Sequence, residues 1–88
     1  MNKELFSFIR AIGEPKRMLI LNHLKKECCV GELWKRLGMA QNLTSHHLRV
    51  LKQAKLIKSE KRGLKVVYEL NQENINKNLK ILEGYLKK

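Results

Sequence analysis

The sequence lacks any long apolar run, and its two cysteines cannot close a loop. Nowhere do about 18 apolar residues follow one another, and the stretch MNKELFSFIRAIGEP has no apolar segment long enough for a secretory signal. Cys28 and Cys29 are adjacent, so they cannot form the loop-closing disulfide that stabilises small secreted domains. These absences predict a cytoplasmic protein without a membrane segment.

Acidic residues are also scarce, with 8 Asp and Glu against 19 Lys and Arg, which gives a formal net charge of +11. The excess is concentrated in residues 35–65, which carry nine of the basic residues and a single acidic one, Glu60. A positive region of this kind favours an anionic partner such as nucleic acid or a lipid surface. The alternative is a solvated basic face without a ligand, because net charge identifies partners only loosely.

The chain is short, and nothing in it divides it. Its 88 residues suit one domain over residues 1–88, which can build a core but has little room for a deep catalytic cleft. There is no internal repeat, linker or low-complexity segment, and no acid/base pair or cofactor loop can be assembled. We therefore expect a protein that is not an enzyme.

Apolar residues spaced three and four apart predict three short helices before residue 40. Their expected ranges are 3–12, a segment that begins at Pro15, and 30–37. Pro15 suits the first turn of a helix, and Met18, Leu21 and Leu24 form the expected buried stripe of that second helix. Gly38 is a natural left-handed end for the third.

A fourth helix is predicted over residues 41–55. Thr44, Leu48 and Leu51 fall on its inward face. Its outward face combines amides, a hydroxyl, an imidazole and cations: Gln41, Asn42, Ser45, His46, Arg49 and Lys52. A helix with such a face is suited to forming hydrogen bonds with another molecule.

After the fourth helix, the apolar period changes from 3.6 toward 2. LIKSEK and KVVYEL read as strands joined around Arg62-Gly63, which predicts a β-hairpin with a basic tip. A last amphipathic helix follows Asn71, with Tyr85 beside its apolar stripe of Ile75, Leu79, Leu82 and Leu86. The fold class is thus mainly α with a small β-hairpin, a winged helix-turn-helix in the order α-α-α-α-β-β-α. The fourth helix would enter the DNA major groove, and the first and last helices would form a dimer.

Three stretches make the chain similar to a known family. GEPKRMLILNHL, CVGELWKRLGMAQNLTSHHLRVLKQAKLI and KSEKRGLKVVYEL resemble the ArsR family of prokaryotic winged-helix repressors across roughly residues 11–70. The phrase Q-x-x-x-S-H-H-L-x-x-L, followed by a basic hairpin, is the most specific part of the match. The resemblance implies a homodimeric transcriptional repressor that binds double-stranded DNA at a palindromic operator and releases it when a small inducer binds.

The resemblance also implies roles for individual residues. Positions matching Gln41, Asn42, Ser45 and His46 reach bases or phosphates, and Arg49 lies on the same outward face. Positions matching the hairpin tip reach the flanking minor groove or backbone, and here they are Lys61, Arg62 and Lys65. Two positions depart from the pattern. Thr44 stands where a buried aliphatic residue is usual, and Lys55 stands where glycine is usual.

The adjacent histidines argue against a metal centre or a nucleophile in the fourth helix. His46 and His47 point about 100° apart on a helix, so they cannot both bind one metal ion from the same face. Ser45 and His46 have no enclosing cleft or orienting carboxylate, which a nucleophilic triad needs. Ser45 and His46 are therefore interpreted as DNA contacts. His47 lies further inward, where it is either a structural histidine or a DNA contact.

The sensor region departs from the family pattern. Family members that sense arsenite or cadmium commonly carry Cys-Val-Cys at the third helix, whereas this chain reads Cys29-Val30-Gly31. The segment NQENINKNLKILEGYLKK lacks the His and Asp of the other common site, so no metal ligand is assigned there. The one cofactor left open is a thiophilic metal or metalloid ion.

Cys28 and Cys29 are nonetheless candidates for a thiol sensor. Nearby lysines and the start of a helix favour a reactive thiolate, which could bind a thiophilic metalloid ion or be oxidised or persulfidated. The alternative is a pair of small, semi-buried side chains that sense nothing. Two wider alternatives also stay open: a DNA-binding protein without an inducer site, and a winged-helix module that binds another protein.

Overall fold

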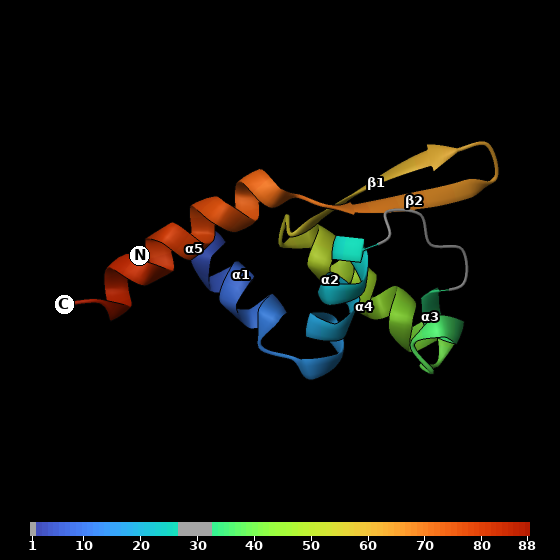
Figure 1. Cartoon of the computed structure of the whole chain (residues 1–88), viewed down its shortest axis with the longest axis horizontal. Coiled ribbons are helices and arrows are strands. Elements are labelled where there is room, and N and C mark those ends of the chain that lie inside the picture. Colours follow the sequence, from blue (N-terminus) through green and yellow to red (C-terminus); the bar gives the residue numbers. More distant parts are fainter. Residues whose placement is uncertain (1, 27–32) are drawn as a thin grey trace.

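The computed structural model describes residues 2–26 and 33–88, in which the helices pack together and one two-stranded sheet projects beside them (Figure 1). The elements are α1 (Lys3–Ile12), α2 (Pro15–Lys26), α3 (Leu33–Arg36), α4 (Gln41–Gln53), β1 (Ile57–Arg62), β2 (Lys65–Leu70) and α5 (Gln72–Leu86). This order confirms the predicted fold class. The expected start of the third helix, residues 30–32, lies outside the described residues. The fourth helix ends at Gln53, two residues earlier than predicted.

The core lies around α4, which contacts α1, α2, α3 and β1. The inward face of α4 consists of the predicted residues Thr44, Leu48 and Leu51, together with His47. Its apolar side chains pack with residues of the other elements into one cluster: Leu5, Phe8, Ala11, Ile20, Leu24, Leu33, Leu48, Leu51, Ala54, Leu56 and Ile57. Because α4 is packed against four elements, the direction of its outer face is fixed by the core.

Thr44 is buried where an apolar residue would be expected. Its side chain is 2% exposed, and its Oγ1 donates a hydrogen bond to the Ala40 carbonyl at 2.9 Å. A buried hydroxyl is tolerated when it has such a partner, and the carbonyl one turn back on the same helix supplies it. The departure from an aliphatic residue therefore leaves no unsatisfied hydroxyl at this point of the core.

The predicted buried stripe of α2 is wrong at Met18. That side chain is 51% exposed, whereas Ile20 and Leu24 are buried and Leu21 is half-buried. The face that points inward therefore follows Arg17, Ile20 and Leu24, spaced three and four residues apart. The guanidinium of Arg17 has hydrogen-bond partners at the corner between α1 and α2, and this allows a charged residue to occupy the inward face.

The end of α4 is stabilised in an unusual way. Lys55 has a φ of 62°, in the left-handed region that glycine occupies most readily. The Leu56 N–H bonds the Leu51 carbonyl at 3.0 Å, which satisfies an otherwise free carbonyl of the last helical turn. Lys55 thus stands at the position where glycine is usual, in the conformation that favours glycine.

We expect Lys55→Gly to stabilise the fold. Removing the side chain from a left-handed residue should raise the free energy of unfolding by about 1 kcal/mol. Lys52→Gly is the matched control, because Lys52 is an exposed lysine inside α4, where glycine should cost about 1 kcal/mol. Urea denaturation at a fixed protein concentration measures both changes. A loss of stability in Lys55→Gly would contradict this account of the helix end.

The two strands form a regular antiparallel hairpin that extends from the body beside α4 (Figure 1). Its register runs from Ile57 opposite Leu70 to Arg62 opposite Lys65, which leaves a two-residue turn. Gly63 has a φ of 64°, as the first residue of such a turn requires. We refer to this hairpin as the wing.

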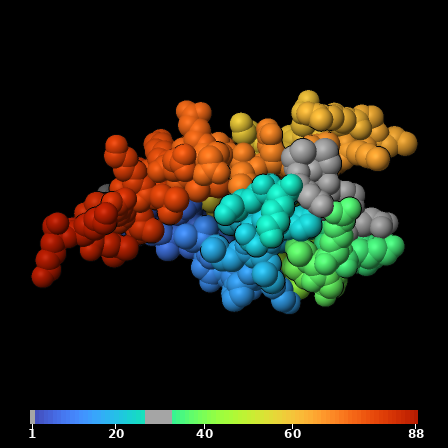
Figure 2. All heavy atoms as spheres, in the orientation of Figure 1, coloured from blue at the N-terminus to red at the C-terminus, as the bar shows by residue number. Residues whose placement is uncertain are grey.

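The molecule is elongated, with principal extents of 46 × 24 × 22 Å. The wing projects at one end, and the C-terminal part of α5 projects at the other (Figures 1 and 2). Among the described helices, none combines the length and the apolar character that crossing a membrane requires. The wing and the projecting part of α5 are therefore well separated, and each can contact a different partner.

Candidate nucleic-acid interface

The outer face of α4 is open at all the positions predicted for it. Gln41, Asn42, Ser45, His46, Arg49 and Lys52 are exposed. The next residue after His46 behaves differently, since His47 is only 5% exposed. Helix α4 therefore has one face held in the core and one face of hydrogen-bonding groups open to a partner.

The first turn of α4 carries no charge that would repel a phosphate. It has no acidic residue, and the residue at its N-cap, Ala40, offers no side-chain acceptor. The Asn42 Oδ1 accepts from the Leu43 N–H at 2.9 Å. The start of a 13-residue helix has a partial positive charge and free backbone N–H groups, which attract anions. This end of α4 suits a DNA backbone.

Two shallow crevices connect the outer face of α4 with its neighbours. One, of about 250 Å³, lies between Ser45, Arg49 and Lys52 of α4 and Ser59 and Tyr68 of the wing. The other, of about 230 Å³, reaches from the same Ser45 and Tyr68 to Gln41 of α4 and Trp34 of α3. The two crevices share residues, so α3, α4 and the wing present one continuous concave surface.

The wing adds cations to this surface. Lys61, Arg62 and Lys65 are all exposed. Since successive strand residues face opposite sides, Lys61 lies on the face of Ser59, and Arg62 and Lys65 lie on the other. Arg62 Nη2 lies 3.2 Å from Glu60 Oε2, but both side chains are more than 60% exposed, and such surface pairs are weak. Arg62 can therefore exchange this pair for a phosphate.

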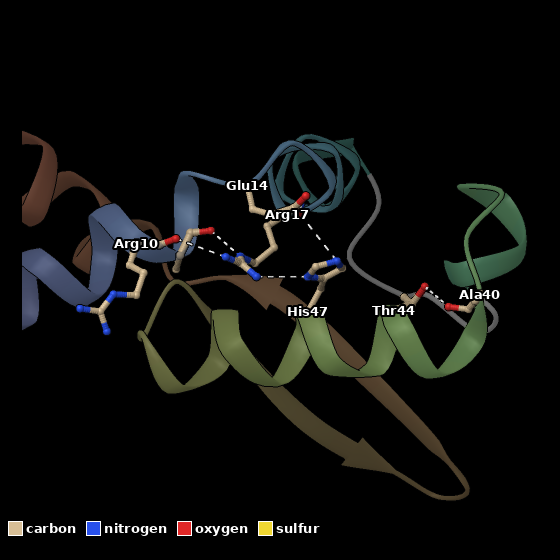
Figure 3. A network of polar contacts seen from close by, with 7 residues as sticks. Arg10, Glu14, Arg17, Ala40, Thr44 and His47 are labelled. Atoms are coloured by element: carbon tan, nitrogen blue, oxygen red, sulfur yellow. Dashed lines mark hydrogen bonds and ion pairs between the residues drawn. The ribbon is translucent and has the colours of Figure 1, made fainter.

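A polar network at the corner between α1 and α2 was not foreseen from the sequence (Figure 3). The Arg17 guanidinium donates to the carbonyls of Ala11 and Arg10, at 2.7 and 3.2 Å, and to Nδ1 of His47 at 3.2 Å. Glu14 Oε2 accepts from the backbone N–H of Arg17 at 3.1 Å and lies 3.6 Å from Nε2 of His47. The sequence signal that could have indicated this network is Arg17, a basic residue in line with the buried residues Ile20 and Leu24 of α2.

These contacts favour the structural interpretation of His47. A guanidinium only donates, so Nδ1 of the ring accepts and Nε2 carries the proton that faces Glu14. Burial lowers the pKa of His47 below its usual value of 6.5, the charges of Arg17, His46 and Lys16 lower it further, and Glu14 opposes them. The ring is therefore neutral at pH 7. Its contribution to stability is complete above pH 6.5 and is lost as the pH falls through the lowered pKa.

The candidate thiol sensor consists of Cys28 and Cys29, which lie outside the described residues. Within residues 2–26 and 33–88, no three or more His, Cys, Asp or Glu side chains gather closely enough to hold a metal ion. Among the described residues, the candidate site is the polar and cationic surface formed by α3, α4 and the wing.

Comparison with known proteins agrees with this arrangement. Residues 14–59 match a family model described as "Bacterial regulatory protein, arsR family". The "Arsenical resistance operon repressor" of Staphylococcus xylosus is 34% identical over 84 residues, covering 91% of this chain and 81% of that protein. "Transcriptional repressor SdpR" of Bacillus subtilis (strain 168) is 35% identical over 72 residues, covering 76% and 80%.

A solved structure is also similar to this one. The "ArsR-like Transcriptional Regulator from Rhodococcus sp. RHA1" superimposes with a TM-score of 0.82 at 28% identity, covering 93% of this chain and 78% of that chain. The helices and the wing described above are therefore arranged as in that transcriptional regulator.

Proposed function

This chain belongs to the ArsR family of bacterial regulatory proteins, and we propose that it acts as a homodimeric repressor of a palindromic operator. It is a DNA-binding transcriptional regulator and not an enzyme. The observation that carries the proposal is the outer face of α4, which presents six exposed polar and cationic side chains beside a cationic wing. In this proposal the protein works in the cytoplasm, where its operator is.

The proposed contacts divide by chemistry. Gln41 and Asn42 carry amides that can pair with a base edge in the major groove. They lie in the first turn of α4, and the N-terminal residues of a recognition helix are the ones that contact base edges. Ser45, His46 and Arg49 continue the same face toward bases or phosphates. The exposed cations of the wing then hold the adjoining DNA backbone: Lys61, Arg62 and Lys65.

The exposed apolar side chains support a dimer. Phe6 of α1 is 40% exposed, and Leu79, Tyr85 and Leu86 of α5 are more exposed still. A second copy of the chain, related by a two-fold axis, would cover these residues with the same residues of its own. Two copies of α4 would then face half-sites one helical turn of DNA apart, which is why the operator should be palindromic.

We expect Gln41→Ala to weaken binding to the preferred operator by about 1 to 3 kcal/mol while leaving binding to unrelated duplexes nearly unchanged. The alanine removes a base contact without removing a charge, so only the sequence-dependent part of the affinity should fall. Fluorescence anisotropy with both duplexes at one salt concentration measures the two effects.

Gln53→Ala is the matched control, because Gln53 is also an exposed glutamine and lies at the other end of α4. It should leave both affinities close to those of the unaltered protein. Equal losses on operator and unrelated DNA in Gln41→Ala would reject Gln41 as a base reader.

The inducer in this proposal is a thiophilic ion or an oxidant that acts at Cys28 and Cys29. The name of the Staphylococcus xylosus relative, an arsenical resistance repressor, supports arsenite as the first ion to test. Following operator release during titration with arsenite, cadmium or persulfide separates an inducible repressor from one that binds constitutively. A protein that binds a protein partner and shows no salt-sensitive DNA binding would instead be an interaction module.

A further inference from the structure

Helix α4 is tied to the rest of the molecule by a polar contact near its middle. Arg17, the first inward residue of α2, reaches across the corner between α1 and α2 and donates to His47 of α4 (Figure 3). The other donors of Arg17 are held by the last carbonyls of α1, those of Arg10 and Ala11. The guanidinium therefore joins α1, α2 and α4 at one point.

The position of this contact relates it to the outer face of α4. His47 directly follows Ser45 and His46, which are exposed on that face. Apolar packing by Leu48 and Leu51 holds α4 against the core, but apolar contacts are not directional. A hydrogen bond from a planar guanidinium is directional, so it fixes how far α4 is rotated about its own axis.

We propose that Arg17 and His47 are positioning residues that orient the outer face of α4 for sequence-specific DNA binding, and that protonation of His47 releases this orientation. The inference rests on the proposed function, since it concerns the same DNA-reading helix. It adds that operator recognition, as distinct from general DNA affinity, falls when the pH is lowered far enough to protonate His47.

The chemistry of the contact gives the direction of the effect. Only the neutral ring can accept from Arg17 at Nδ1, because protonation puts an N–H group there, opposite the guanidinium N–H. Glu14 at 3.6 Å partly offsets the added charge by holding Nε2. Arg17 and Lys16 on α2 and His46 on α4 oppose protonation, as burial does, and these set the lowered pKa of His47.

The other elements packed against α4 do not add a charge that opposes protonation of His47. The groups of α1 in this network are the carbonyls of Arg10 and Ala11, which accept from Arg17. Among the described residues, no charged group of α1, α3 or β1 is a cause of the lowered pKa of His47. The neutral state of the ring therefore depends on burial and on the residues named above, and an acidic solution should disturb this contact directly.

The test compares the affinity for the operator with that for an unrelated duplex of the same length at two pH values. One is pH 7.5, and the other is an acidic pH below the pKa of His47, which an NMR titration of the ring locates. The ratio of the two affinities removes charge effects that are common to both duplexes. We expect the ratio to fall below the lowered pKa of His47. The fall should be at most about a hundredfold for each further pH unit, because each protomer of the proposed dimer contributes one proton.

Three single variants identify the responsible residue, because the chain has three histidines, His23, His46 and His47. His47→Gln keeps an acceptor for Arg17 but does not titrate, so its ratio should be the same at both pH values. His23→Gln and His46→Gln should retain the fall, although His46→Gln should also bind more weakly. Circular dichroism at both pH values shows that each variant is folded.

Arg17→Met provides a second test that does not depend on protonation. It should give a low ratio at both pH values, whereas Arg10→Met should resemble the unaltered protein, because the Arg10 side chain points away from His47 (Figure 3). An unchanged ratio in Arg17→Met, or the same fall with pH in His47→Gln, would overturn the inference.

Hydrogen exchange of the α4 amides in the free protein separates the two proposals. Protection of α4, corrected for intrinsic exchange rates, should fall at the acidic pH in the unaltered protein and stay constant in His47→Gln. Equal protection at both pH values would reject the inference even if the operator is bound normally. Failure to bind any duplex, with the expected change in exchange, would reject only the proposed function.

Discussion

Replacing Lys61, Arg62 and Lys65 by alanine together should weaken binding to every DNA duplex by roughly 100-fold or more at physiological salt. These three cations lie on the exposed wing, and in a dimer the triple variant would leave up to six phosphates without a cation. Counterion release makes such binding salt-dependent, so the slope of log affinity against log salt should also become shallower, by about 0.9 for each phosphate that is no longer neutralised. Titrations of operator and unrelated duplexes over a series of salt concentrations measure both quantities.

A control with the same change in net charge shows whether the wing itself matters. Lys80, Lys87 and Lys88 belong to α5 and the residues after it, at the end of the molecule opposite the wing (Figure 1). Their triple alanine variant should change affinity only slightly, because charges further apart than about 8 Å are largely screened at physiological ionic strength. Equal losses of affinity in the two triple variants would mean that total charge, and not the wing, binds DNA.

Leu79→Glu should abolish the proposed dimer and, with it, high affinity for the palindrome. Leu79 lies on the exposed apolar stripe of α5, and a carboxylate buried there on dimerisation would cost several kcal/mol. The dimer should therefore dissociate at concentrations roughly 100-fold higher than normal or more. Sedimentation velocity over a range of protein concentrations measures this change, and DNA titration shows whether the separate protomers still bind one half-site weakly.

Gly84→Glu introduces the same charge at another position of α5. A Cβ at this position meets nothing within 4 Å, so the variant should fold normally. Gly84 lies nine residues after Ile75, about 180° around α5 from the apolar stripe, so the charge should leave the proposed dimer intact. An unchanged association constant in Leu79→Glu would show that α5 does not form the interface.

The sequence predicted the element order because each segment has a clear apolar period and a clear end. The fourth helix and the wing were predicted best, since α4 has one apolar and one polar face and the hairpin turn contains a glycine. The outer face of α4 followed from the same period, so its exposed residues were also predictable. The apolar period predicts burial from the polarity of each side chain. It is therefore correct wherever apolar residues are buried and polar residues are exposed.

Periodicity failed where a polar residue is buried. Arg17 takes an inward position on α2 because carbonyls and an imidazole surround it, so the stripe predicted through Met18 was displaced. Asn78 is the fully buried residue of α5, with its Nδ2 donating to the Asn74 carbonyl at 2.9 Å. The partners of Arg17 come from α1 and α4, and the pattern of one helix does not contain that information. His47 was ambiguous for the same reason, since its partner Arg17 is thirty residues away in the chain.

The residues that face DNA in the proposal are the ones whose positions follow from local periodicity. The residues that orient them, Arg17 and His47, are connected only through the tertiary structure. Variation of the outer face can therefore change which operator is read, while variation of the corner between α1 and α2 changes how well any operator is read.

Selection of bound fragments from a random DNA library tests the central claim most directly. If two copies of α4 present their outer faces to successive turns of one duplex, the selected fragments should contain an inverted repeat. Its half-site centres should be about 10 base pairs apart, and each duplex should bind two chains. Fragments without a shared sequence, or a single unrepeated site occupied by one chain, would contradict the account.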